Sequence, residues 1–448
     1  MTVLVLGLTG ETGSTGLASL RRLLEKHKSE AGFSLRDLDG REVLEVSGKV
    51  PKLPASLVKT ISSACALRTL GPEYQFETRF GMRGEDLIVS GSGDPSFVIE
   101  NLHGIVDAIR DLHGIKEIKG SMIFDTSYFG AKSLVIASGF EGDEGRSFAS
   151  NLTPFAFNHN SFGILVAPGS PKALVALAPS AAIDLKIQNA VQVVSGTSQA
   201  IVVDYRPSDK ILSLKGSIGR DAPVRAFYRA VPDVYPSFAR VFAQVWMDRG
   251  GVWKKPTYDF SQSTGAIRNL WTHSSQPVSR LLLDINKLST NFGAELVSLA
   301  ASSTALGRPA TFSKLETWLN SCVRDMGVKA NEMVLKNASG LSRETRVTAS
   351  SLTQFLSSVS REDFFPEYLS SLSILGKDGT TKRRLKSMAG RGRLKTGSIK
   401  GVRSIAGYLY PDGKAPLSFA LIFNNAKIGG SEIQDLENRI IEVILDSL

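Results

Sequence analysis

Three short motifs stand far apart in this chain, and they can act together only if the fold brings them to one place. They read as S-x-x-K, S-x-N and K-T-G, at Ser56-Leu57-Val58-Lys59, Ser289-Thr290-Asn291 and Lys395-Thr396-Gly397-Ser398. In this order they are the parts of a serine acyl-transfer site that uses lysine as its base. Because a long segment separates the first motif from the second, the chain must leave the catalytic domain after one and return before the other.

The first motif predicts a helix that begins at or near Pro54. Ser56 and Lys59 then share one face, a single turn apart. Lysine can take the serine proton only if its pKa falls well below about 10.4, which burial and a neighbouring cation achieve. Lys395 is a candidate for that cation. S-x-x-K alone also arises by chance, so only the ordered set of motifs is informative.

The third motif predicts a strand from Arg393 to Ser398, followed by a hairpin whose turn is Pro411-Asp412-Gly413. An amphipathic helix is expected from Ile433 to Leu448. Gly397 would let a substrate backbone approach the strand closely. The alternative for the motif alone is an edge strand with an ordinary exposed lysine.

With these motifs the chain resembles the class C low-molecular-mass penicillin-binding proteins, the DacB-like group of D-alanyl-D-alanine carboxypeptidases and endopeptidases. The resemblance runs from about Phe33 to the C-terminus. Thr290 departs from it, because the family more often has aspartate there. The further matching segments are Leu53-Pro54-Ala55-Ser56 with Leu70-Gly71-Pro72, Gly91-Ser92-Gly93-Asp94-Pro95-Ser96, Phe124-Asp125-Thr126-Ser127-Tyr128-Phe129, Asn158-His159-Asn160-Ser161-Phe162, Ser339-Gly340-Leu341-Ser342-Arg343 and Gly376-Lys377-Asp378-Gly379-Thr380.

The resemblance implies an α/β (α+β) serine transpeptidase/β-lactamase-like catalytic domain with an inserted β-rich region of one or two domains. The expected boundaries are 17–70 plus 255–448 for the catalytic domain and 71–254 for the insertion. Residues 1–16 are interpreted as a leader of uncertain origin. Within the insertion, Val191 to Val203 and Ile211 to Ile218 are the clearest strand candidates.

The resemblance also implies a role for each motif residue. Ser56 would attack the carbonyl of a D-alanyl residue and Lys59 would accept its proton. Backbone N–H groups of Ser56 and Ser398 would hold the oxyanion. The remaining roles are proton transfer to the leaving amine by Ser289 beside Lys395, a hydrogen bond to the substrate backbone from Asn291, and binding of the substrate carboxylate by Lys395, Thr396 and Ser398.

An acidic residue after the Phe124–Phe129 segment is the family's contact for a diaminopimelate amine. Its spacing from Phe162 indicates Asp143, with Glu144 as the alternative. The expected partners are therefore peptidoglycan peptides and β-lactam inhibitors, and the expected location is the periplasm, although no clear signal peptide is visible. The oligomeric state stays open. A β-lactamase-like hydrolase and a catalytically silent cell-wall-binding protein are the other functions that this pattern allows.

The N-terminus offers a competing interpretation. Val3 to Gly13 followed by a helical stretch mimics the strand, glycine-rich turn and helix of a dinucleotide site. The continuation instead predicts a hairpin through Asp39-Gly40, which does not fit a βαβ unit. A nucleotide site is therefore disfavoured.

Composition sets limits on partners and cofactors. The formal net charge is +10 and no apolar run is long enough to span a membrane. Basic residues are scattered and form no nucleic-acid motif, so no nucleic-acid partner is expected. The densest basic segment, Lys382 to Arg393, is interpreted as mainly solvated surface, with polymer binding as the alternative. Cys65 and Cys322 predict no disulfide framework, Cys65 being placed in the core, and the histidines lack ligand spacing, so neither a metal nor a cofactor is expected.

Overall fold

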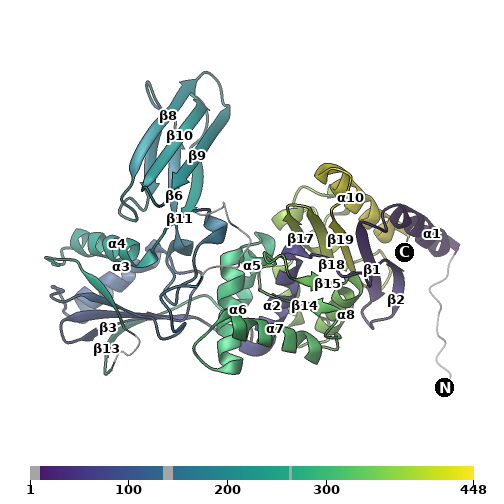
Figure 1. Cartoon of the computed structure of the whole chain (residues 1–448), viewed down its shortest axis with the longest axis horizontal. Coiled ribbons are helices and arrows are strands. Elements are labelled where there is room, and N and C mark those ends of the chain that lie inside the picture. The colour runs from purple at the N-terminus through teal and green to yellow at the C-terminus, as the bar shows by residue number, and fades with distance from the viewer. Residues whose placement is uncertain (1–10, 135–144, 262–264, 448) are drawn as a thin grey trace. The chain divides into compact units, whose positions relative to one another are not determined.

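The computed structural model describes residues 11–134, 145–261 and 265–447 (Figure 1). The chain forms two compact units. The first contains the chain up to Tyr74 together with Pro277–Leu306 and Phe312–Leu448, and the second contains Gln75–Gln276 and Gly307–Thr311. The return to the first unit was expected at residue 255, but the structure places it at Pro277. Residues 255–276 include β12 and β13, which pair with strands of the second unit.

The first unit is built on a six-stranded sheet with the order β16-β17-β18-β19-β1-β2, antiparallel throughout. Its two expected hairpins are present, and Gly40 takes the positive φ of +89° that the first turn requires. The strands are β1 (Ala31–Asp37), β2 (Glu42–Val46), β16 (Ser373–Ile374), β17 (Gly392–Ile399), β18 (Val402–Leu409) and β19 (Leu417–Asn424).

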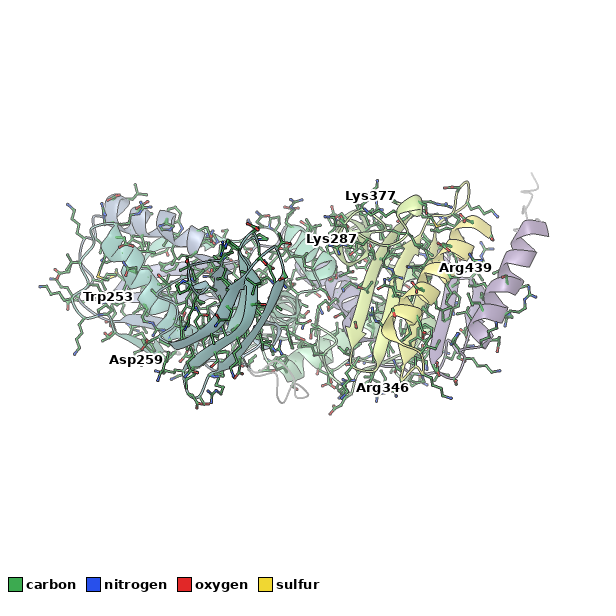
Figure 2. All side chains as sticks on the ribbon, turned by 90° about the horizontal axis from the view of Figure 1, so that it is seen from above. Trp253, Asp259, Lys287, Arg346, Lys377 and Arg439 are labelled. Atoms are coloured by element: carbon green, nitrogen blue, oxygen red, sulfur yellow. A yellow bond between two sulfur atoms is a disulfide. The ribbon has the colours of Figure 1, made fainter. Side chains whose placement is uncertain are left out.

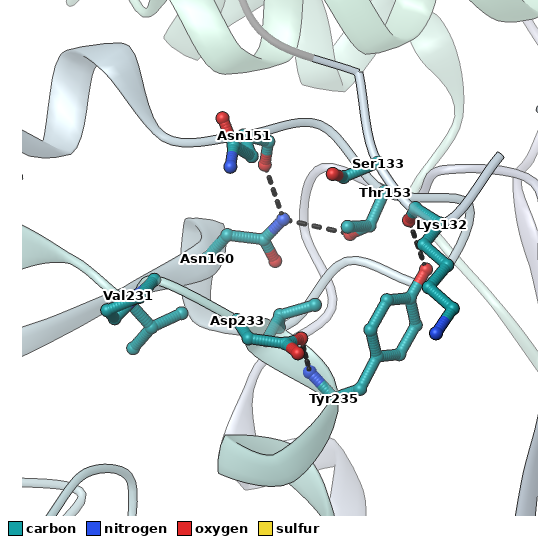
Figure 3. Close-up of a pocket in the computed structure, with 10 residues that line it drawn as sticks. Lys132, Ser133, Asn151, Thr153, Asn160, Val231, Asp233 and Tyr235 are labelled. Carbon is teal, nitrogen blue, oxygen red and sulfur yellow. Dashed lines mark hydrogen bonds between the residues drawn. The ribbon is translucent and has the colours of Figure 1, made fainter. Parts of the chain in front are cut away.

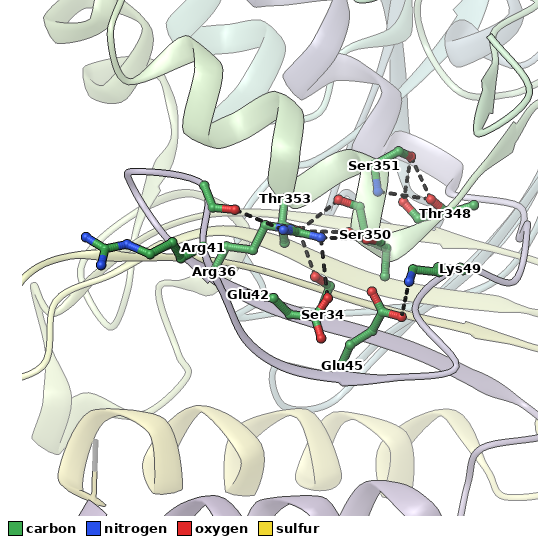
Figure 4. Close-up of polar contacts among 12 residues, drawn as sticks. Ser34, Arg36, Arg41, Glu42, Glu45, Lys49, Thr348, Ser350, Ser351 and Thr353 are labelled. Atoms are coloured by element: carbon green, nitrogen blue, oxygen red, sulfur yellow. Dashed lines mark hydrogen bonds and ion pairs between the residues drawn. The ribbon is translucent and has the colours of Figure 1, made fainter. Parts of the chain in front are cut away.

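Helices cover both faces of this sheet. α1 (Glu11–Glu25) and α10 (Gly430–Ser447) pack on each other and share an apolar core with odd-numbered β1 residues such as Phe33. α8 (Ala349–Val359) packs on the opposite face of the sheet. Because alternate strand residues point to opposite sides, the even-numbered residues of β1 face this helix. There Ser34 Oγ is 2.7 Å from Thr353 Oγ1, and Arg36 donates to Ser350 Oγ at 2.8 Å (Figure 4).

The rest of the first unit is helical. α2 is buried on nearly all sides because it packs against α5, α6 and α7. The elements are a 3-10 turn at Ala55–Leu57, α2 (Val58–Leu70), α5 (Val278–Lys287), α6 (Asn291–Leu306), α7 (Phe312–Asp325), β14 (Met333–Val334), β15 (Arg346–Val347), α9 (Phe365–Ser371), and 3-10 turns at Gly379–Thr381 and Lys386–Met388.

A disulfide joins Cys65 in α2 to Cys322 in α7. From sequence, the two cysteines indicated no disulfide framework, and the bond between them corrects that expectation. The two residues are 257 positions apart, and only the packing of α7 on α2 brings them together.

The second unit combines a five-stranded mixed sheet, β12-β5-β4-β3-β13, with two three-stranded sheets, β8-β10-β9 and β11-β6-β7. The segment 191–203 is not one strand, because it turns at Gly196 between β8 and β9. The elements are β3 (Glu77–Arg83), β4 (Asp86–Gly91), α3 (Ile99–Asp107) with a π turn at Ala108–Leu112, β5 (Met122–Asp125), 3-10 turns at Ser147–Ala149 and Asn158–Asn160, β6 (Ser161–Ala167), β7 (Leu174–Ala178), β8 (Lys186–Val194), β9 (Gln199–Arg206), β10 (Ile211–Gly219), β11 (Arg225–Ala230), α4 (Val234–Asp248), β12 (Tyr258–Ser261) and β13 (Arg268–Ser274).

Candidate active site

Ser56 lies in the 3-10 turn that leads into α2, close to the helix start expected at Pro54. The turn is tight, because Ala55 has a φ of +51°, which is strained for a residue with a side chain. Lys59 follows one turn later and is fully buried. Its Nζ lies 3.0 Å from Ser56 Oγ, within hydrogen-bond distance.

Two further acceptors surround the Lys59 ammonium. Asn291 Oδ1 and the carbonyl oxygen of Ser339 each lie 2.7 Å from Nζ. Burial lowers the pKa of Lys59 to about 7, against a smaller opposing effect of the Glu295 carboxylate. A neutral amine has two N–H donors and one lone pair, so with both donors used the lone pair is free for the serine.

The second and third motifs meet through Lys395, which is fully buried in β17. Its Nζ donates to Ser289 Oγ at 2.9 Å and to the Thr396 carbonyl at 2.8 Å. Burial, and secondarily the charge of Lys59, hold the pKa of Lys395 well below its usual value. Ser289 has a φ of +62°, so the turn before α6 is also strained.

β17 passes directly behind the serine. A Cβ added at Gly397 would lie 2.8 Å from the Pro54 carbonyl oxygen and 3.1 Å from the Ser56 nitrogen. Ser404 on the neighbouring strand donates to the same Pro54 carbonyl at 2.7 Å. Glycine is therefore required at position 397 by close backbone approach. Ser398, the next residue, is exposed, as carboxylate binding would need.

The structure thus brings together eight residues that the sequence analysis selected: Ser56, Lys59, Ser289, Asn291, Lys395, Thr396, Gly397 and Ser398. Asp143 and Glu144 lie outside the described residues, so the diaminopimelate contact stays a prediction.

Sequence reasoning missed several neighbours of the site. Glu295 is a buried carboxylate in α6, and its position four residues after Asn291 on the same helix was an available signal. Thr380 accepts a hydrogen bond from Thr396 Oγ1 at 2.8 Å. The loop that carries Thr380 is held by Lys287, whose Nζ is 2.6 Å from Asp378 Oδ2 (Lys287 is labelled in Figure 2).

The basic segment 382–393 is not uniformly solvated surface. Arg384 is 7% exposed and forms an ion pair with the buried Glu437 of α10, at 2.9 Å. Arg391 lies 3.3 Å from Asp446. These two arginines attach the loop before β17 to the C-terminal helix, and Lys382 and Arg383 remain exposed.

A hollow of about 170 Å³ lies within the second unit beside the start of α4 (Figure 3). Its polar groups largely bond to one another: Asn160 Nδ2 donates to the Asn151 carbonyl, and Asp233 accepts the N–H of Tyr235. Among the described residues, no cluster of three His, Cys, Asp or Glu side chains could hold a metal ion. In the same part of the chain, no helix is long and apolar enough to cross a membrane.

The sequence model of the D-Ala-D-Ala carboxypeptidase 3 (S13) family matches residues 17–446. The chain belongs to this family. It is a serine DD-peptidase, and its mixed helix-and-sheet fold is that of the penicillin-binding protein 4 type.

Relatives support the assignment along most of the chain. A D-alanyl-D-alanine carboxypeptidase of Actinomadura sp. (strain R39) is 25% identical over 86% of this chain and 76% of its own length. D-alanyl-D-alanine carboxypeptidase DacB of Haemophilus influenzae is 24% identical over 90% of this chain and 87% of its own. The crystal structure of penicillin-binding protein 4 (dacB) from Haemophilus influenzae superposes with a TM-score of 0.79 at 21% identity, covering 95% of this chain and 99% of that chain.

Proposed function

We propose that this S13-family enzyme cleaves D-alanyl bonds of peptidoglycan peptides through an acyl-enzyme on Ser56, with Lys59 as the general base. One observation carries the proposal: Ser56 Oγ lies 3.0 Å from the Nζ of a buried lysine whose pKa falls to about 7. A lysine tuned to that value is half neutral at neutral pH and can accept a proton.

In acylation, Lys59 takes the Ser56 proton as Oγ attacks the carbonyl carbon of the D-alanyl bond. The backbone N–H groups of Ser56 and Ser398 donate to the resulting oxyanion. As the intermediate collapses, the C–N bond breaks and the leaving amine takes a proton from Ser289. Lys395, 2.9 Å from Ser289 Oγ, replaces that proton. Lys59 then releases its proton to solvent and Lys395 regains one. Neutral Lys59 deprotonates a water that attacks the ester carbonyl, and as the ester C–O bond breaks Lys59 returns that proton to Ser56 Oγ.

The substrate carboxylate is assigned to Lys395, Thr396 and Ser398. Lys395 lies in an environment that disfavours its own charge, and an incoming carboxylate would compensate for this. Carboxypeptidase and endopeptidase activities differ in the amine that leaves, which is D-alanine in one case and a diaminopimelate side chain in the other. Asp143 is proposed as the contact for a free diaminopimelate amine.

The enzyme is placed outside the cytoplasm, in the periplasm where the cell has one. The Cys65–Cys322 disulfide supports this, because such bonds persist in oxidising compartments. β-Lactams are proposed as inhibitors. Penicillin-binding protein 4 from Haemophilus influenzae, which shares the fold, has a structure complexed with a novel β-lactam.

Brief exposure to benzylpenicillin followed by intact-mass spectrometry and peptide mapping tests the proposal. One adduct is expected, on Ser56, and Ser56→Ala should remove it while circular dichroism stays native. The fold should tolerate this change because Lys59 keeps its contacts with Asn291 and Ser339. An adduct on another serine contradicts the proposal. Absence of any adduct would indicate a silent wall-binding protein, and rapid penicillin turnover a β-lactamase.

A further inference from the structure

Glu295 is a fully buried carboxylate that lies on α6, one turn after Asn291. Its oxygens accept the backbone N–H groups of Ala338 at 3.1 Å and Ser339 at 2.9 Å. Removing a carboxylate from water is costly, and here the cost is offset by two backbone hydrogen bonds, one of them from Ser339, whose carbonyl contacts the lysine base. Buried ionisable groups of this kind are frequent where a catalytic group must be held in place.

Glu295 holds the turn at residues 337–340, and further hydrogen bonds fix other backbone groups of this turn. The Ala338 carbonyl accepts from Ser62 Oγ at 2.9 Å, and the Gly340 N–H donates to Asn337 Oδ1 at 3.2 Å. Gly340 has a φ of +82°, and an added Cβ would collide with the Ala55 carbonyl oxygen. The turn is therefore packed directly on the backbone beside the nucleophile.

One polar group of this turn faces the active site. The Ser339 carbonyl accepts a hydrogen bond from Lys59 Nζ at 2.7 Å. Together with Asn291 Oδ1, it engages both N–H donors of a neutral Lys59 and leaves the lone pair for Ser56. If either acceptor moved, the amine could rotate and the lone pair would lose its alignment.

We propose that Glu295 is a positioning residue for the acylation step. By holding the N–H groups of Ala338 and Ser339, its carboxylate fixes the carbonyl that aims Lys59 at Ser56. α6 then supports the base twice, directly through Asn291 and indirectly through Glu295. The inference rests on the proposed function, because it takes Lys59 to be the base for Ser56.

The carboxylate also acts on Lys59 through its charge. Among the described residues, the charged groups that act on Lys59 are Glu295 from α6 and Lys395 from β17. The negative charge of Glu295 raises the pKa of Lys59, against the larger lowering by burial. Burial raises the pKa of Glu295 itself, and its hydrogen bonds to residues 338 and 339 oppose that rise. Substitutions of Glu295 can therefore separate its hydrogen bonding to residues 338 and 339 from the effect of its charge on the pKa of Lys59.

Two variants make the separation. Glu295→Asp keeps the charge but shortens the side chain, so the backbone N–H groups lose their partner. Glu295→Gln keeps the length but removes the charge and places an amide donor against those N–H groups. The second-order rate constant for acylation by a fluorescent penicillin is measured from pH 5 to 8.5 and normalised to titratable sites. Glu437→Gln, which removes another buried carboxylate of the same unit, is the matched control.

Both Glu295 variants should acylate about 10- to 100-fold more slowly, the loss expected for a misplaced reacting group. Because the charge of Glu295 raises the pKa of Lys59, the acid side of the pH profile of Glu295→Gln should also move to lower pH. The acid side of the profile of Glu295→Asp, which keeps the charge, should stay where it is. Glu437→Gln should be less stable than the wild type, but its acylation rate constant and the acid side of its pH profile should be unchanged. Wild-type rates and pH profiles in both Glu295 variants would overturn the inference.

If Glu295→Gln yields no folded protein, Ser62→Ala tests the same turn by freeing the Ala338 carbonyl. A several-fold slower acylation supports the role of the turn, and an unchanged rate overturns it. Acylation of the wild-type protein distinguishes failure of this inference from failure of the proposed function. If Ser56 is not acylated at all, the proposed function fails, whatever the Glu295 variants do.

Discussion

The acylation rate should depend on pH through Lys59, because only its neutral form can accept the serine proton. Its pKa is lowered to about 7. The neutral fraction is then about one half at pH 7, one tenth at pH 6 and one hundredth at pH 5. A lysine with an ordinary pKa would be neutral in only about one molecule in 2,500 at pH 7. The rate constant should therefore fall about tenfold per pH unit on the acid side.

Quenched-flow labelling with a fluorescent penicillin at constant ionic strength measures this rate constant, and intrinsic fluorescence checks that the protein stays folded. Lys52→Gln is the control. Lys52 is also buried and burial lowers its pKa, but its side chain lies beside Gly32 of β1 and its charged neighbour is Glu30, so its loss should leave the acid limb in place. A rate constant at pH 5 within about twofold of that at pH 7.5 would refute the assignment of Lys59 as a tuned base.

Three further tests have defined outcomes. Lys59→Arg should lose nearly all acylation, because arginine cannot become a base, whereas Lys395→Arg should retain more; equal rates in a labelling time course would contradict the division of roles. Gly397→Ala should slow acylation and lower stability by about 1–3 kcal/mol in urea titration, because its methyl group would push β17 away from the Ser56 backbone; wild-type behaviour would mean that the strand adapts. Replacing Cys65 and Cys322 by serine should cost about 2–5 kcal/mol of unfolding free energy, with an unchanged labelling stoichiometry in the folded fraction; an unchanged melting temperature would show that the bond constrains little.

Much of the first unit was predictable because its signals are local. The helix at α10 and the hairpin of β18 and β19 follow from apolar periodicity and from the Pro411-Asp412-Gly413 turn. The segment 191–203 is strand at both ends, as predicted, but it also contains a turn that local signals did not indicate. Its residues favour strand throughout, and only the pairing of β8 and β9 with β10 places a turn inside it.

Features that join distant parts of the chain were not predictable. The Cys65–Cys322 disulfide depends on how α7 packs against α2. Arg384 was expected at the surface, because a run of basic residues is usually solvated, yet Glu437 from the C-terminal helix pairs with it in the interior. Neither partner has a local pattern that marks the other.

The sequence by itself determined the chemistry that this protein can perform. It supplies a serine one turn before a lysine, and two later motifs whose order identifies the reaction. Only the tertiary structure decided that the pKa of Lys59 falls into the range that the proposed base requires, because a lysine pKa reflects its surroundings and not its neighbours in sequence. Burial by α2 and α6 lowers that pKa, and the carbonyl of Ser339 completes the set of acceptors around the amine. These surroundings come from segments hundreds of residues apart, and they exist only when the chain is folded.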